Sequence, residues 1–484
     1  MGAMDDPWSN LPPSRLPACE SARMDAAAQR RGFDLWQLMQ RAGQALAESA
    51  QSLNGELPIL ICCGGGNNGG DGWVAAECLH RGGHSVAVWP LQEPRSALCQ
   101  AAAKSAQGSG LGLVNGPEGK TWGLIVDAIL GAGQRPQLSP ELDAALDRLS
   151  RCGAPILACD LATGPLKPQH ILAMQVGKQE NPPQIERIAD LGIPPACWLE
   201  VDGHCLADLP RHRRQSHKGN NGRLLAIGGG PFPGALSLAS QSAMRAGCDL
   251  VFAWTTRSCP LPETIIPLYQ EGPQLAPCPD SSLAERIAGV DAVLIGPGMG
   301  NSASAQAAAR QALELAMAAR RPCLIDADGI AACAPLLRQY NHPSAPIILT
   351  PHAKEAASLL GQEAPTWVDL HAWAGPKRVI LAKGPVDLIS DGRQWQRHHG
   401  GNPRLSVGGS GDCLAGLCSG LLARGCPPFA AARLACYWLC ACADQLWQEQ
   451  GPCYDPRDLI QNLGPSLKNL FTTWQAQAWP PISD

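Results

Sequence analysis

Short apolar runs that end in glycines or in a carboxylate recur along the chain, and this pattern most constrains the fold. Residues 57–63 form one such run, followed by a glycine-rich loop at 64–72 and a helical stretch at 73–81. Residues 154–160 form another run, which ends at an aspartate. Short apolar runs bounded by turn residues are typical of buried strands. Strands that alternate with helices form a parallel sheet covered on both faces, so the sequence predicts a doubly wound α/β fold.

The length of the chain and one polar stretch indicate two domains of this kind. A chain of 484 residues can bury at least two cores. The basic, polar segment 209–215 is typical of a linker, and the strand–helix alternation starts again after it. We therefore expect an N-terminal Rossmann-like domain at residues 1–208, with two amphipathic helices within residues 17–50, and a C-terminal domain at residues 209–484.

Charge and hydropathy argue against several classes of partner. The net charge of -4 gives no reason to expect a nucleic acid or an acidic membrane surface. No uncharged stretch approaches the roughly 20 apolar residues that a membrane span needs, and the N-terminus does not resemble a signal peptide. We therefore expect a cytoplasmic protein.

The 21 cysteines lie inside apolar runs such as residues 434–443. Cysteine in such a run behaves as a small buried hydrophobic residue. No Cys-x-x-Cys pair is matched by a second pair at zinc spacing. The sequence therefore does not predict metal–thiolate chemistry.

Three carboxylates follow consecutive predicted strands in the first half of the chain. Asp71, Asp127 and Asp160 lie at or just beyond the strand ends, and the carboxyl ends of parallel strands form the edge at which ligands bind. Asn67 and Asn68 add side-chain oxygens that could ligate a hard monovalent cation or bind a ribose. Ordinary Asx capping of a helix is the alternative for these side chains. Three aspartates on one edge favour a binding site.

A glycine-rich segment near the C-terminus, residues 405–416, surrounds Asp412 and leads into an apolar helix. A glycine loop at a helix start presents backbone N–H groups and the positive helix end to an anion such as phosphate. A carboxylate beside phosphate is explained if it accepts a proton from a neighbouring hydroxyl. The alternative is that Asp412 only caps the helix. Asp326 and Asp328 end another predicted strand, and we expect them to orient this edge rather than to react.

The first half of the chain resembles the N-terminal domain of the YjeF family, whose members are NAD(P)H-hydrate epimerases. The resemblance is carried by Asn-Asn-Gly-Gly-Asp-Gly at 67–72, Val-Asp-Ala-Ile-Leu-Gly at 126–131 and Asp-Leu-Ala-Thr-Gly at 160–164. It implies that Asn68, Asp127 and Thr163 bind potassium, and that Asp160 is the catalytic acid or base. It also implies that the hydrated nucleotide is bound by Asn67, Asn68, Gly69, Gly70, Asp71, Gly131, Ala132, Gly133, Gln134, Arg135, Pro136 and Asp160.

The second half, from Ser216 to Leu446, resembles the C-terminal YjeF domain, a ribokinase-like NAD(P)H-hydrate dehydratase. Its motifs occur in the family's order and end in Gly-Gly-Ser-Gly-Asp at 408–412. The resemblance implies that Asp412 is catalytic at the reacting hydroxyl. It implies that the hydrated nucleotide contacts Ala235, Gly298, His352 and Asp412, and that the adenine nucleotide is bound by Lys383, Gly384, Pro385, Val386, Asp387 and Gly411.

The two resemblances together imply an enzyme that repairs nicotinamide cofactors. The N-terminal domain would interconvert the R and S hydrates, NADHX or NADPHX. The C-terminal domain would dehydrate the S epimer with ADP, which turns the hydroxyl into a phosphate leaving group. Potassium and magnesium ions are the other implied cofactors, and a homo-oligomer is the expected assembly. A ribokinase-type small-molecule kinase and a non-catalytic N-terminal binding domain remain as alternatives.

Overall fold

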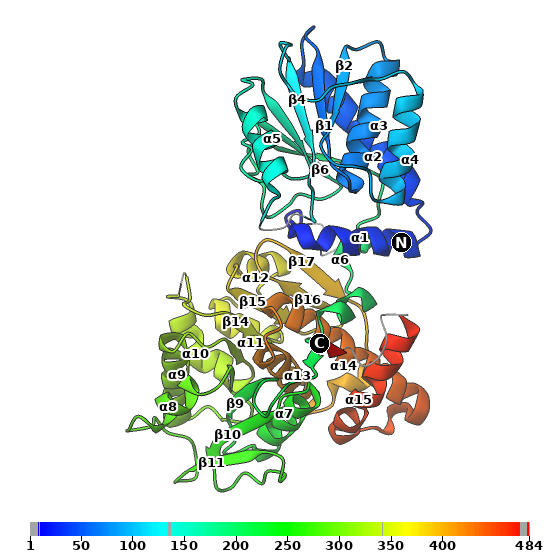
Figure 1. The fold of residues 1–484 in the computed structure, drawn as a ribbon. Helices are drawn as coiled ribbons and strands as arrows, with labels where there is room; N and C mark the ends of the chain where they lie inside the picture. The colour runs from blue at the N-terminus through cyan, green and yellow to red at the C-terminus, as the bar shows by residue number, and fades with distance from the viewer. Residues whose placement is uncertain (1–7, 9, 134–136, 341, 475–481, 484) are drawn as a thin grey trace. The chain divides into compact units, whose positions relative to one another are not determined.

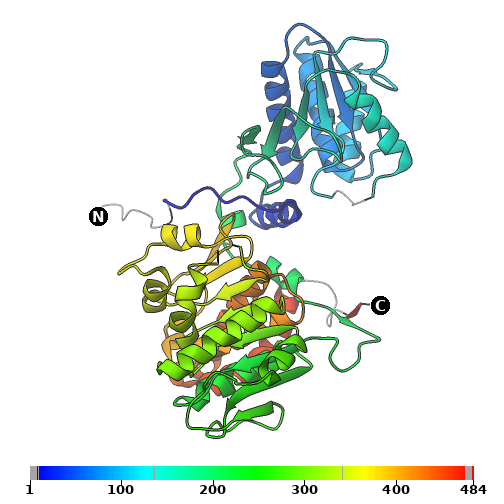
Figure 2. The ribbon, with the colours of Figure 1, turned by 90° about the vertical axis from the view of Figure 1, so that its left-hand side faces the viewer.

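The computed structural model describes Trp8 and residues 10–133, 137–340, 342–474 and 482–483. The chain folds into two compact units (Figures 1 and 2). The first unit is Ser14–Trp198. The second unit begins at Leu199 and also includes the N-terminal segment up to Pro13. Both are α/β units with a core of parallel strands, which confirms the predicted fold class.

The unit of Ser14–Trp198 is built on a parallel sheet with the strand order β3-β2-β1-β4-β5-β6-β7. The order reverses between β1 and β4, and in open α/β sheets ligands bind beyond the carboxyl ends of the strands at such a point. The strands are β1 (Ile59–Cys63), β2 (Val86–Pro90), β3 (Gly112–Leu113), β4 (Leu124–Ala128), β5 (Ile156–Cys159), β6 (His170–Met174) and β7 (Glu186–Ala189).

Helices cover both faces of this sheet (Figure 1). The side chains of α2, α3 and α4 pack on one face and those of α5 on the other. The two amphipathic helices predicted within residues 17–50 are confirmed as α1 and α2. The helices are η1 (Ala18–Glu20), α1 (Ser21–Arg30), α2 (Leu35–Leu53), α3 (Asn67–Arg81), α4 (Ala97–Gly108), α5 (Pro140–Ser150) and, at the boundary of the unit, α6 (Ala196–Leu199).

Helix α3 begins earlier than the glycine-rich sequence predicts. The predicted loop at 64–72 is mostly the start of this helix, because α3 begins at Asn67. A Cβ added to Gly69 would lie 1.9 Å from the carbonyl oxygen of Gly64, and one added to Gly72 would lie 2.7 Å from Cβ of Ala128. The glycines therefore let α3 lie directly against β1 and β4, and tertiary packing overrides their low helix propensity.

The second unit contains a larger sheet with the strand order β11-β10-β9-β12-β13-β14-β15-β16-β17. The strands from β11 to β15 are parallel, and the last two pair antiparallel. The strands are β9 (Arg223–Ile227), β10 (Leu250–Thr256), β11 (Ile266–Gln270), β12 (Ala292–Ile295), β13 (Cys323–Ile325), β14 (Ile347–Leu349), β15 (Arg378–Ala382), β16 (Asp387–Ser390) and β17 (Trp395–His398), with a separate pair of β8 (His212–Arg213) and β18 (Ile482–Ser483).

Helices also cover both faces of this second sheet (Figure 1). Side chains of α7, α13, α14 and α15 form the core on one face, and those of α8 to α12 form the core on the other. The helices are η2 (Gly203–Asp208), α7 (Pro233–Arg245), α8 (Ser282–Ala288), α9 (Ala303–Ala318), α10 (Asp328–Leu337), α11 (Ala353–Leu360), α12 (Trp367–Trp373), η3 (Pro403–Ser406), α13 (Ser410–Ala423), α14 (Pro428–Gln450), η4 (Gly451–Cys453) and α15 (Pro456–Thr473).

Helix α13 starts at the glycine-rich segment and runs through the centre of one helix layer. Its N-cap is Gly409, whose φ of 100° is a conformation that favours glycine. A Cβ added to Gly416 would lie 2.0 Å from the carbonyl oxygen of Ala239. Small residues therefore bring α13 against α7 backbone to backbone, which fixes where the first turn of α13 points.

The segment before Ser14 packs on the second unit through its tryptophan. The ring of Trp8 stacks on Trp367 with centroids 4.8 Å apart and lies 6.2 Å from the ring of Trp395. The indole N–H of Trp395 donates to the carbonyl oxygen of Pro12 at 2.9 Å. This unit is therefore built from both ends of the described chain.

Within the described ranges, no helix combines the length and the apolar character needed to cross a lipid bilayer.

Candidate functional site

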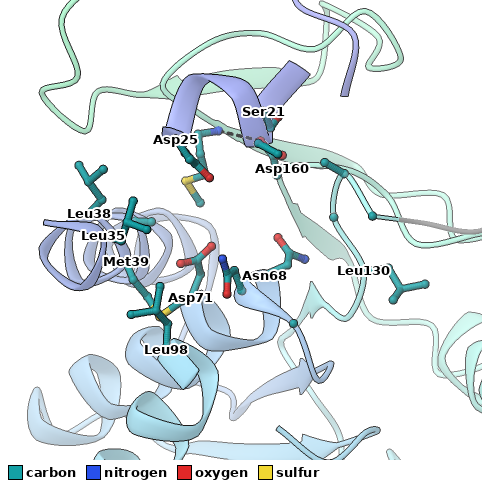
Figure 3. A pocket seen from close by; sticks show the side chains of 18 of the residues that line it. Ser21, Asp25, Leu35, Leu38, Met39, Asn68, Asp71, Leu98, Leu130 and Asp160 are labelled. Carbon is teal, nitrogen blue, oxygen red and sulfur yellow. Dashed lines mark hydrogen bonds between the residues drawn. The ribbon is translucent and has the colours of Figure 1, made fainter. Parts of the chain in front are cut away.

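A cavity of about 410 Å³ lies at the carboxyl ends of β1 and β4, where the strand order reverses (Figure 3). Figure 3 shows an apolar wall made by Leu35, Leu38, Met39 and Leu98. The polar side chains that line the cavity include Asn67, Asn68, Asp25, Asp71, Asp160 and Lys178. An apolar wall with a few convergent polar groups is typical of a small-molecule site.

Asp160 follows β5 in a strained conformation that its neighbours hold in place. Its φ is 64°, in the left-handed region that side chains other than glycine rarely adopt. Nζ of Lys178 lies 2.9 Å from its Oδ1, which also accepts the N–H of Met174 at 3.0 Å. The amide of Asn181 donates to the carbonyl oxygen of Asp160 at 2.8 Å. Strain that surrounding groups maintain in this way is typical of functional sites.

Two further carboxyl groups share this cavity with Asp160. Burial raises the pKa of Asp71 well above its ordinary value, and the negative charges of Asp160 and Asp25 add to this effect. Burial also raises the pKa of Asp25 to about 6, an effect that the ammonium of Lys178 partly offsets. The cavity therefore combines a carboxylate that pairs with an ammonium group and a carboxyl group that favours its neutral form.

The three residues implied as potassium ligands lie around the loop that follows β4. Asp127 is fully buried, and its carboxylate accepts the N–H and the hydroxyl of Thr163, both at 2.7 Å. The hydroxyl of Thr163 accepts the N–H of Leu130 at 3.1 Å, and Oδ1 of Asn68 lies 3.3 Å from the position of a Cβ on Gly131. Burial raises the pKa of Asp127 to about 6, although these hydrogen bonds lower it.

The remaining residues predicted for this site divide into three groups. Gly131, Ala132 and Gly133 line the cavity together with Asn67. Gly69 and Gly70 are buried within α3, and an added Cβ on Gly70 would lie 2.5 Å from Cε of Met39, so they serve helix packing. Gln134, Arg135 and Pro136 lie outside the described residues.

In the second unit, Asp412 lies in the first turn of α13. The N-cap position belongs to Gly409, so Asp412 is not the N-cap that one alternative required. Burial raises the pKa of Asp412 to about 7, and the carboxylate of Asp326 adds to this increase, while Lys383 opposes it. A carboxyl group with this pKa can both accept and release a proton near neutral pH.

Lys383 lies at the end of β15 among several acidic groups. Its Nζ is 2.8 Å from Oδ1 of Asp326 and 3.7 Å from Oε2 of Glu355. Burial lowers the pKa of Lys383, but the charges of Asp326 and Glu355 outweigh burial and the pKa is raised. The hydroxyl of Thr350 also donates to Oδ1 of Asp326, at 2.6 Å. Lys383 is therefore a positioned cation close to Asp412.

His352 is the N-cap of α11 and stands at the end of β14. Its Nδ1 accepts the N–H groups of Lys354 and Glu355 at 3.1 and 3.3 Å. Its Nε2 lies 3.4 Å from Oε1 of Glu355, and half of its side chain is exposed. The imidazole is thus fixed by the helix start with one edge open to solvent.

The predicted contact residues Gly298, Ala235 and Gly411 lie at places where backbone segments approach closely. An added Cβ on Gly298, whose φ is 67°, would lie 2.1 Å from the carbonyl oxygen of Phe232 and 3.1 Å from Cβ of Ala235. A Cβ on Gly411 would lie 3.5 Å from Nζ of Lys383. The structure therefore brings Gly298 close to Ala235, and Gly411 close to Lys383.

The predicted nucleotide segment, Lys383 to Asp387, forms the turn between β15 and β16. Gly384 and Pro385 are exposed and Val386 is half-buried. Oδ1 of Asp387 accepts the N–H of Gly384 at 2.9 Å, and its Oδ2 accepts the thiol of Cys436 at 3.1 Å. Burial raises the pKa of Asp387. The carboxyl group of Asp387 is therefore turned inward and closes the turn.

Three charged side chains without a predicted catalytic or binding role lie beside the predicted site residues. The sequence predicts only an orienting role for Asp326, although its carboxylate lies closer to Lys383 than that of Glu355 does. Its place directly after a predicted strand is the signal that could have identified Asp326 as a site residue. Asp25 has no predicted role, because nothing in the local pattern links it to Asp160. Lys178 stands near a lysine that the family carries, but the motifs assign it no role.

Two doubly wound units, each with acidic groups beyond its strand ends, define a two-site α/β protein suited to small-molecule chemistry. Family comparison supports the same division. A family profile described as NAD(P)H-hydrate dehydratase matches residues 224–465, and one described as YjeF-related protein N-terminus matches residues 36–174. The chain belongs to the family of bifunctional NAD(P)H-hydrate repair enzymes, as its motifs predicted.

Similar relatives named as bifunctional NAD(P)H-hydrate repair enzymes align along nearly their whole length. The relative from Hyperthermus butylicus is 30% identical over 94% of this chain and 92% of its own. The relative from Pyrobaculum aerophilum is 32% identical over 88% and 92%, and that from Escherichia coli is 30% identical over 95% and 92%. The alignments therefore cover both units.

One solved structure similar to part of this chain is an ADP/ATP-dependent NAD(P)H-hydrate dehydratase from Bacillus subtilis co-crystallised with ATP and magnesium. It is 26% identical, covers 56% of this chain and 99% of its own, and has a TM-score of 0.47.

Proposed function

We propose that this enzyme repairs hydrated nicotinamide nucleotides at two sites. The second unit dehydrates the S epimer of NADHX or NADPHX with ADP, and the first unit interconverts the R and S epimers. The observation that carries the proposal is the place of Asp412, a carboxyl group with a pKa of about 7 in the first turn of α13. The family to which the chain belongs supports the class of substrate.

Asp412 acts as the base at the hydroxyl group of the substrate. As the hydroxyl oxygen bonds to the terminal phosphorus of ADP, the bond from that phosphorus to AMP breaks and the hydroxyl proton passes to Asp412. Phosphate then leaves the ring carbon with the bonding electron pair, and loss of a proton from the neighbouring carbon restores the double bond. Transfer of the phosphoryl group is useful here because phosphate leaves far more readily than hydroxide.

The groups around Asp412 offset the negative charge of the phosphates. The first-turn N–H groups of α13 and the positive end of this helix point toward the same region, and Lys383 adds a full positive charge. Magnesium binds phosphates together with one or two carboxylates, and Asp326 and Asp328 at the end of β13 have the required chemistry. Magnesium would supply further charge neutralisation during transfer.

Epimerisation in the first unit requires one group that accepts a proton and one that donates it. Asp160, held by the ammonium of Lys178, is the acceptor. Asp71 faces the same cavity, and its raised pKa makes it the donor. Two carboxyl groups whose environments differ in this way supply the acid and the base of one reaction.

Asn68, Asp127 and Thr163 fit a potassium ion by their chemistry. All three carry oxygen ligands, and within the described residues no lysine or arginine contributes to the pKa of the buried Asp127. Nδ2 of Asn68 is buried and has no hydrogen-bond partner in that part of the chain, so rotation of the amide would leave an oxygen free for a cation. The ion would supply positive charge beside Asp127.

Asp412→Asn tests the dehydratase assignment. With the S hydrate and ADP, recovery of the reduced-nicotinamide absorbance should fall by roughly 10² or more, because general base catalysis is lost while the shape is kept. Asp391→Asn, in the turn between β16 and β17, is the control and should retain the rate. Full activity in a folded Asp412→Asn protein would exclude this role.

The kinase alternative predicts a different product. A small-molecule kinase would consume ATP and accumulate a phosphorylated alcohol. The dehydratase should instead release AMP, phosphate and the reduced nicotinamide nucleotide in equal amounts. Quantifying these products by chromatography separates the two functions.

Asp160→Asn tests the epimerase assignment against a binding role. The variant should lose interconversion of the R and S hydrates while dehydration of the S epimer continues, because Asp160 and Asp412 belong to different units. An unchanged rate of epimerisation would remove Asp160 from the mechanism.

A further inference from the structure

A buried cluster of potential metal ligands lies in the second unit, next to Asp387 at the end of the predicted nucleotide segment. One ring nitrogen of His398 and the Sγ atoms of Cys436 and Cys440 lie within 4.8 Å of one another. These side chains are 7%, 1% and 6% exposed, respectively. Oδ2 of Asp387 lies 3.1 Å from Sγ of Cys436 and adds a carboxylate oxygen to the group.

Local geometry explains why these four side chains meet. Cys436 and Cys440 are four residues apart on α14, so they lie one above the other on one face of this helix. Asp387 and His398 are directly opposite each other in the antiparallel pairing of β16 and β17, so both project from the same face of the sheet. Helix α14 packs against both strands. The helix supplies two sulfur atoms, and the strand pair supplies a nitrogen and an oxygen.

The dimensions and chemistry of this group suit zinc. Structural zinc is bound by thiolates, imidazoles and carboxylates in a tetrahedron. Bond lengths of about 2.3 Å to sulfur and about 2.0–2.1 Å to nitrogen place the ligand atoms roughly 3.3–3.8 Å apart. The ligand atoms of His398, Cys436 and Cys440 lie within 4.8 Å of one another, an upper limit about 1 Å above these values.

His398 carries a buried ring nitrogen whose hydrogen-bonding capacity is not used by any described residue. Its Nε2 is buried and makes no hydrogen bond within the part of the chain that the structure describes. A buried polar atom without a partner costs free energy. In a zinc site one ring nitrogen binds the metal and the ligation fixes the tautomer of the ring, which gives this imidazole a defined role.

We propose that Cys436, Cys440, His398 and Asp387 bind one zinc ion in a structural site. Four protein ligands close the tetrahedron, so the ion ties α14 to β16 and β17 and has no open position for catalysis. On binding, the two thiol protons pass to solvent, including the proton that Cys436 donates to Asp387. The spacing argument against metal–thiolate chemistry considers Cys-x-x-Cys pairs, whereas the ligands proposed here come from a helix turn and a strand pair.

Cys442 lies on the same helix and lies outside the cluster of potential ligands. It is fully buried, and its thiol donates to the carbonyl oxygen of Leu459 at 3.5 Å. It therefore serves as the matched control for substitutions on α14.

Metal analysis of the full-length protein tests the site. The protein is produced without a polyhistidine tag in zinc-supplemented medium and purified without chelator. We expect about one zinc ion per chain, at least about a tenfold loss in Cys436→Ser and in Cys440→Ser, and no loss in Cys442→Ser. A zinc content that both cysteine substitutions leave unchanged would overturn the proposal.

Cobalt reconstitution of the wild-type protein keeps the test decisive if the cysteine variants do not fold. Zinc is removed with a chelator, and Co²⁺ is added to the folded protein. An intense thiolate-to-cobalt charge-transfer band with tetrahedral visible bands supports the site. A wild-type protein that contains no zinc and gives no such spectrum would overturn it.

Discussion

At the scale of the residue, both sites depend on carboxyl groups removed from water. Burial raises the pKa of Asp412 in one unit and of Asp71 in the other, because a low dielectric disfavours the charged form. Each also lies near further carboxylates, which disfavour a second negative charge. Proton transfer near neutral pH needs groups adjusted in this way.

The pH dependence of dehydration should follow Asp412. A base must be deprotonated to act, so kcat/KM should fall as the pH drops through about 7, the pKa of this group. The measurement is kcat/KM for the S hydrate with saturating ADP across the range from acid to mildly alkaline pH. A profile that is flat through neutral pH would contradict the assignment.

Lys178 should matter more for stability than a surface lysine does. Lys178→Met leaves the Asp160 carboxylate without its ammonium partner, and breaking a buried pair costs about 3–5 kcal/mol. Urea denaturation of the first unit measures the loss. Asp160→Asn combined with Lys178→Met should recover much of it, because the unpaired charge is gone. A single variant as stable as the wild type would show that the pair contributes little.

At the scale of the element, glycines within helices determine how closely the helices approach their neighbours. Gly69 and Gly72 bring α3 against β1 and β4, and Gly416 brings α13 against α7. The sequence pattern predicts a ligand-binding loop at residues 64–72, which include Gly69 and Gly72. In the structure these glycines act mainly through packing, and the packing places Asp71 and Asp412 at the edges of their sheets.

Gly416→Ala tests this packing role. The new Cβ would meet the carbonyl oxygen of Ala239, so we expect a destabilisation of at least about 1–3 kcal/mol from overpacking. Gly234→Ala on α7 is the control, because nothing lies within 4 Å of its added Cβ, and its effect should stay within about 1 kcal/mol. Thermal unfolding compares the two variants. Equal stability of both would contradict the close approach.

At the scale of the whole molecule, each unit has its own core and its own site. The unit that begins at Leu199 also recruits the segment that contains Trp8 from the other end of the chain. The ring of Trp8 is 7% exposed between Trp367 and Trp395. Trp8 therefore contributes to the stability of the second unit.

Trp8→Ala should destabilise the second unit by about 3–5 kcal/mol through the lost ring contacts. Trp447→Ala removes a tryptophan that is 38% exposed and should cost much less. Chemical denaturation followed by dehydratase activity reports on the second unit, and epimerase activity reports on the first. An equal loss in both activities would show that Trp8 does not act on the second unit alone.

The sequence by itself determined the strand–helix alternation, the division into two α/β units and the position of Asp412 at a helix start, because these features depend on local periodicity and turn residues. Only the tertiary structure decided which distant side chains meet. Lys383 and Asp326 are 57 residues apart in sequence, and they come together because β13, β14 and β15 are neighbours in the sheet. Asp25 reaches the cavity from α1, and Cys436 meets Asp387 across a helix and a strand. Such contacts follow from the order of strands and the packing of helices, which no local pattern encodes.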